Sequence, residues 1–67
     1  MRIKKQSSKE FWGTHKGYEI QIDREPDGSF YILVWNEHGH AYDGWAPEEV
    51  RTMSEAKQEA LRGAGIN

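Results

Sequence analysis

The chain has 67 residues, no cysteine and a formal net charge of −2. This length predicts one small domain, which buries only about 60% of its unfolded surface, and without cysteine no disulfide or thiolate metal site can stabilise it. No apolar run approaches the roughly 20 residues of a membrane span, and no apolar segment follows the basic N-terminus as in a signal peptide, so we expect a cytoplasmic protein.

The first element that we expect is a mobile basic arm over residues 1–10, followed by a single domain over residues 11–67. Residues 1–16 carry five basic side chains against one acidic, a net charge of +4, whereas residues 17–67 carry −6. The basic side chains of the arm are Arg2, Lys4, Lys5 and Lys9. Such a segment is either a solvated tail or an arm that contacts phosphate or an acidic partner.

Three segments then alternate in the manner of strands. GYEIQID at 17–23 has apolar side chains at every second position, and REPDG is a turn because Pro26 fixes φ and Gly28 accepts a positive φ. FYILVW at 30–35 is a second strand and HAYDGW at 40–45 a third. The faces of FYILVW carry Phe30, Ile32 and Val34 on one side, and Tyr31, Leu33 and Trp35 on the other.

Residues 52–65 carry the signals of one helix. Thr52 and Glu55 have the spacing of a capping box, and Gly63 or Gly65 ends the helix. An apolar stripe follows the helical period. Its members are Met53, Ala56, Ala60, Leu61 and Ala64. Because most of them are small, the helix can lie close to a sheet.

These elements predict an α+β fold, in which an antiparallel β-meander of three strands has one C-terminal helix packed on one face. The segment Phe11–Trp12 either adds a fourth strand or folds back over the sheet. One face of the second strand is expected beneath the helix, which leaves Tyr31, Leu33 and Trp35 uncovered on the other. That face is covered by the Phe11–Trp12 segment, by a second copy of the chain or by another protein.

Catalytic and metal sites are not expected. His38 and His40 flank a glycine turn, whereas a tight metal site needs three or four ligands in fixed geometry. The carboxylates lie mainly in turns, where water is plentiful, and each serine lacks a nearby candidate base, so nothing resembles tuned acid–base machinery. We therefore expect no enzymatic activity, no cofactor and no small-molecule substrate.

The segments GYEIQI, DGSFYILVW and TMSEAKQEA carry a resemblance. The chain looks like the small β-β-β-α domains common in bacterial and prophage genomes, many of uncharacterised function. Over residues 11–65 it is also similar in outline to the arm-binding N-terminal domain of phage-type integrases, which has three strands and a helix. An integrase sheet of this kind reads DNA with basic residues, whereas this sheet is acidic, so no DNA-binding residue is transferred.

The expected function is a non-enzymatic binding module that acts through protein contacts, with another protein or with a second copy. The expected binding surface consists of Tyr31, Leu33, Trp35 and Tyr42, with Trp12 and Trp45 at its margin. One alternative is a nucleic-acid-binding module that uses the basic arm, although the acidic sheet makes nucleic acid the less expected partner. Another alternative is a small phage-encoded inhibitor that occupies a basic site on a host protein.

Overall fold

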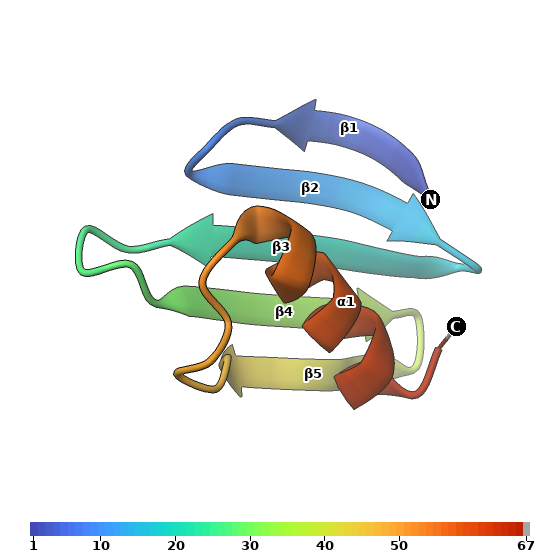
Figure 1. The fold of residues 1–67 in the computed structure, drawn as a ribbon. Helices are drawn as coiled ribbons and strands as arrows, with labels where there is room; N and C mark the ends of the chain where they lie inside the picture. The colour runs from blue at the N-terminus through green and yellow to red at the C-terminus, as the bar shows by residue number, and fades with distance from the viewer. Residues whose placement is uncertain (67) are drawn as a thin grey trace.

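A computed structural model describes residues 1–66 as a five-stranded antiparallel sheet with one helix across one face (Figure 1). The elements are β1 (Arg2–Gln6), β2 (Glu10–His15), β3 (Tyr18–Arg24), β4 (Phe30–Asn36), β5 (Gly39–Trp45) and α1 (Met53–Ala64). The strands lie in sequence order across the sheet. The predicted α+β meander with a C-terminal helix is therefore confirmed, but it has five strands rather than three or four.

The core lies between α1 and the sheet face beneath it. Six large apolar side chains on this face, from alternate positions of β2, β3 and β4, are at most 1% exposed. These residues are Phe11, Ile20, Ile22, Phe30, Ile32 and Val34. From α1, Ala56 and Ala60 complete the core and are also fully buried. Small helix residues let the backbone of α1 approach the sheet closely, as the sequence predicts.

The helix begins and ends as its sequence predicts. The Thr52 hydroxyl accepts a hydrogen bond from the Glu55 backbone N–H (3.1 Å), and the Glu55 carboxylate accepts one from the Thr52 backbone N–H (3.0 Å). These reciprocal bonds make the capping box. At the other end Gly65 adopts the left-handed conformation (φ 74°) and caps the helix, while Gly63 lies inside it.

Residues 2–6, expected in a mobile arm, instead form the edge strand β1, which pairs with β2. The turn between the two strands depends on Ser7, whose hydroxyl accepts hydrogen bonds from the backbone N–H groups of Lys9 (3.2 Å) and Glu10 (3.0 Å). The predicted boundary after residue 10 therefore falls inside β2. All five side chains of β1 are exposed, so the strand has no apolar periodicity that would reveal it.

The Phe11–Trp12 segment belongs to β2, and it does not fold across the face opposite α1. Phe11 is buried on the α1 side, whereas Trp12 points away from it and is 41% exposed. The link from β2 to β3 is a two-residue turn in which Lys16 and Gly17 both have positive φ (51° and 86°), as type I′ hairpin turns require. The sheet face away from α1, which we call the open face, has no second layer within residues 1–66 (Figure 1).

Candidate protein-binding face

The strand register arranges the open face in three rows that run across the sheet. The first row holds Glu10, Asp23, Tyr31 and Trp45. The second holds Lys5, Trp12, Gln21, Leu33 and Asp43. The third holds Arg2, Thr14, Glu19, Trp35 and His40. Neighbours within a row lie on adjacent strands, about 5 Å apart, so the rows bring together residues that are far apart in the sequence.

All three tryptophans of the chain lie on the open face, together with Tyr31 and Leu33. Trp45 is 58% exposed, and Trp35 is half-buried. Trp45 packs edge-to-face on Tyr31, with ring centroids 5.0 Å apart and an interplanar angle of 83°, a favoured aromatic geometry. The structure thus brings five of the six residues expected in the binding surface onto one face.

The basic side chains beside Trp12 are engaged within the chain. Glu19 accepts hydrogen bonds from the Trp12 indole N–H (2.8 Å) and from Lys4 Nζ (3.1 Å), and Lys4 Nζ also lies 4.8 Å from the centroid of the Trp12 ring. The bond from Trp12, followed by that from Lys4, lowers the pKa of the Glu19 carboxyl. Lys5 forms a second ion pair with Glu10 at 3.1 Å. On the β1–β2 half of the open face, Lys4 and Lys5 are therefore both paired, and Arg2 is the basic residue without an ion-pair partner within residues 1–66.

The charges on the β3–β5 half of the open face are not paired in this way. The Tyr31 hydroxyl donates a hydrogen bond to the Asp43 carboxylate, and this bond raises the pKa of Tyr31. Neither Asp23 nor Asp43 has an ion-pair partner within residues 1–66. The nearest basic residue in the sequence, Arg24, points to the opposite face, where its guanidinium lies 5.9 Å from the Phe30 ring centroid. Two carboxylates near Tyr31 and the exposed Trp45 ring thus have no ion-pair partner in the described part of the chain.

Tyr42 does not lie on the open face, although the sequence places it with the other residues of the expected binding surface. It pairs with Val34 on the α1 side, where its hydroxyl donates a hydrogen bond to Glu59 at 2.9 Å. A Cβ atom added to Gly63 would lie 2.2 Å from the Tyr42 ring, so the ring lies directly against the helix backbone. Tyr42 and Trp45 are an odd number of residues apart, and the period of two in a strand places such residues on opposite faces.

The environment of Tyr42 predicts a pH dependence of stability. Burial, followed by the hydrogen bond to Glu59, raises the pKa of Tyr42 to about 12, whereas an unfolded tyrosine titrates near 10. The folded state thus favours the neutral phenol, so this contribution is complete below about pH 10 and is lost as the pH rises toward about 12. In urea unfolding at increasing alkaline pH, Tyr42→Phe should show a smaller fall in the free energy of unfolding than the unsubstituted chain. An identical fall in both proteins would contradict this assignment.

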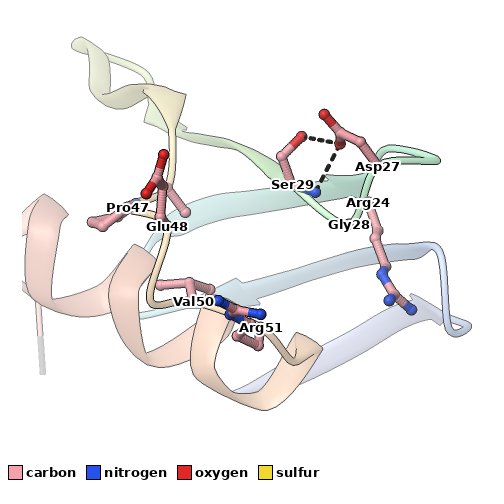
Figure 2. A pocket seen from close by; sticks show the side chains of 9 residues that line it. Arg24, Asp27, Gly28, Ser29, Pro47, Glu48, Val50 and Arg51 are labelled. Carbon is pink, nitrogen blue, oxygen red and sulfur yellow. Dashed lines mark hydrogen bonds between the residues drawn. The ribbon is translucent and has the colours of Figure 1, made fainter.

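A pocket of about 520 Å³ lies at the end of the sheet where the β3–β4 turn meets the β5–α1 loop (Figure 2). The residues that line it include Arg24, Asp27, Glu48 and Arg51. The Asp27 carboxylate accepts hydrogen bonds from the Ser29 hydroxyl (2.6 Å) and backbone N–H (2.9 Å), which lower the pKa of Asp27. These bonds close the turn, so the carboxylate has a local structural role.

The fold adds no further residue within residues 1–66 to the metal site, the acid–base site or the nucleic-acid site weighed from the sequence. Residues 1–66 contain no grouping of three or more His, Asp or Glu side chains that could hold a metal ion near His38 or His40. In the same part of the chain, no polar or charged side chain is buried. Of the basic residues considered for nucleic acid, Arg2, Lys4 and Lys5 lie on β1, at one edge of the sheet, and Lys9 lies in the turn after it.

No protein-family model, curated protein or solved structure matches this chain. None of the helical structure in residues 1–66 is long and apolar enough to cross a membrane.

Proposed function

We propose that the chain is a non-enzymatic binding module that acts through protein contacts on its open face. The observation that supports this proposal most strongly is the position of the three tryptophans. The core is filled by Phe11, Phe30 and aliphatic residues, while Trp12, Trp35 and Trp45 all lie on the open face, which no other element of residues 1–66 covers. Contiguous exposed aromatic side chains on a small domain mark interaction surfaces, and tryptophan and tyrosine dominate their binding energy.

The side chains of this face are also held in place before any partner arrives. Trp12 is fixed by its hydrogen bond to Glu19, Tyr31 by its bond to Asp43, and Trp45 by its packing on Tyr31. A side chain that is already ordered loses little conformational entropy on binding, which favours affinity. A sheet of five paired strands holds these groups in a fixed pattern.

The proposal predicts that Trp45→Ala weakens association and leaves the fold intact. Trp45 is 58% exposed at the end of the edge strand β5, so its removal creates no cavity in the core. Truncation of an aromatic hot spot costs about 2 kcal/mol or more, or about 30-fold in affinity. The immobilised chain and its variant should be compared for the proteins that each retains from an extract of the native cell, with affinities then measured for a retained protein. Sedimentation velocity of the free chain measures self-association.

Gln58→Ala is the matched control, because Gln58 is exposed on α1, away from the open face. The control should retain the same partner as the unsubstituted chain, or form the same oligomer. Equal association of Trp45→Ala and Gln58→Ala would contradict the proposal. Tight binding of duplex DNA that weakens steeply with salt and needs Lys9 and Arg2 would instead favour the nucleic-acid alternative.

A further inference from the structure

We infer that the open face binds a basic surface of another protein, with arginine or lysine side chains placed against Asp23 and Asp43 beside Tyr31 and Trp45. We call these four residues the aromatic–carboxylate patch. The inference rests on the proposed function, and it adds the chemistry of the partner.

The charges of the open face determine whether a basic or an acidic partner surface fits it. Lys4 and Lys5 are engaged by Glu19 and Glu10, so a partner finds few free cations on the β1–β2 half. On the other half, β4 has no charged residue and β5 has one carboxylate, Asp43, beside neutral or weakly basic groups. Of the charged residues in the three rows, Arg2, Asp23 and Asp43 have no ion-pair partner within residues 1–66. Arg2 lies on β1, at the edge of the sheet opposite β5, so the unpaired charges of the β3–β5 half are both negative.

The register adds a local repulsion that a cation would relieve. Asp23 lies directly opposite Glu10 on β2, and like charges in this position destabilise a sheet. On its other side Asp23 is paired with Tyr31, which in turn is paired with Trp45. A positive group above this row meets a carboxylate and two aromatic rings within the span of three strands.

Guanidinium groups suit this arrangement in chemical terms. An arginine side chain forms charge-assisted hydrogen bonds with a carboxylate and stacks its planar group on an aromatic ring. Lysine also interacts with aromatic faces, and the chain itself shows the pairing, since Lys4 contacts both the Trp12 ring and Glu19. The partner would repeat on the β3–β5 half the contacts that Lys4 makes on the β1–β2 half.

Two other occupants fit the charges less well. A second copy of the chain would bring Arg2, Lys4 and Lys5 as the basic residues of its own open face, and the two lysines are already paired. Nucleic acid would bring phosphates against Asp23 and Asp43. The charge complementarity therefore favours a basic surface on a different protein.

The test uses the full chain and short synthetic peptides. One peptide alternates arginine with valine, and matched peptides carry glutamate or serine in place of arginine. In NMR titrations the arginine peptide should shift the Trp45 indole and the β3–β5 amides, with an affinity that falls as salt is added. The double variant Asp23→Asn/Asp43→Asn should bind this peptide about tenfold more weakly. The control Glu48→Gln/Glu49→Gln changes the net charge equally, in the exposed β5–α1 loop, and should bind as the unsubstituted chain does.

Three results would overturn the inference: equal binding of the arginine and glutamate peptides, no binding of the arginine peptide, or equal losses in both double variants. These results are distinguishable from a failure of the proposed function. If Trp45→Ala still weakens association with a retained protein while Asp23→Asn/Asp43→Asn does not, the open face is a binding surface and its partner is not basic. If the variants form fewer dimers in sedimentation, the occupant is a second copy.

Discussion

Phe11→Ala is expected to lower the free energy of unfolding by about 3–5 kcal/mol, the range for a buried aromatic residue replaced by alanine. Phe11 is fully buried on the α1 side of β2, and Lys57 Nζ lies 4.7 Å from its ring centroid. A domain of 67 residues has a total stability of roughly 3–10 kcal/mol. The substitution should therefore remove a large share of this stability, which urea unfolding followed by circular dichroism will measure.

Trp12→Ala is the control, because Trp12 is the next residue of the same strand and lies on the other face. Its side chain is 41% exposed, and its removal loses one hydrogen bond and one cation contact. We expect a much smaller loss of stability from this change than from Phe11→Ala. Equal losses from both substitutions would mean that β2 does not present Phe11 to the core.

Gly13→Ala is expected to destabilise the fold by about 1–3 kcal/mol, the usual cost of overpacking. A Cβ atom at this position would lie 2.6 Å from the backbone oxygen of Arg2 and 2.9 Å from the Phe11 ring. The oxygen belongs to β1 and cannot move without shifting that strand. We expect β1 to separate from β2, which amide hydrogen exchange will detect as faster exchange in this pair of strands.

Gly44→Ala provides the comparison for Gly13→Ala, since Gly44 also lies in a strand and a Cβ atom there meets nothing within 4 Å. Its replacement should leave the stability unchanged or raise it slightly, because alanine restricts the unfolded chain more than glycine does. Similar destabilisation by the two substitutions would show that loss of glycine itself, rather than contact with β1, is responsible.

The sequence predicts β3, β4 and α1 because each has a regular apolar period and defined ends. The capping box at Thr52 and the alternation of Tyr18–Arg24 are local features, and local features survive folding unchanged. The edge strand β1 could not be predicted in this way, because all its side chains are exposed and charged residues are common at sheet edges. The remaining signal was the Ser7–Ser8 pair, since serine hydroxyls close turns by accepting backbone hydrogen bonds.

The composition of the open face is predictable where a strand is regular. Alternation alone places Tyr31, Leu33 and Trp35 together. Alternation also separates Tyr42 from Trp45, so the sequence alone excludes a shared face for these two residues. Which of them faces α1 required the position of β5 relative to β4, where the register shifts between Val34 and Trp35. No local pattern in the sequence fixes such a β-bulge, because it depends on how two strands pair. Lys4 and Lys5 lie on β1 and pair with Glu19 and Glu10 rather than with Asp23 or Asp43. These ion pairs could not be inferred from the sequence, because β1 itself was not predicted.

The order of the strands has a consequence for the way in which the chain acquires its structure. Each strand pairs with the one before it in the sequence, so the sheet can grow hairpin by hairpin as the polypeptide leaves the ribosome, and low sequence separation between partners favours fast folding. The core, however, is closed by α1, which follows all five strands in the sequence. Until it docks, the aliphatic face of β3 and β4 is exposed, and this interval is when a nascent chain of this kind is most prone to aggregate.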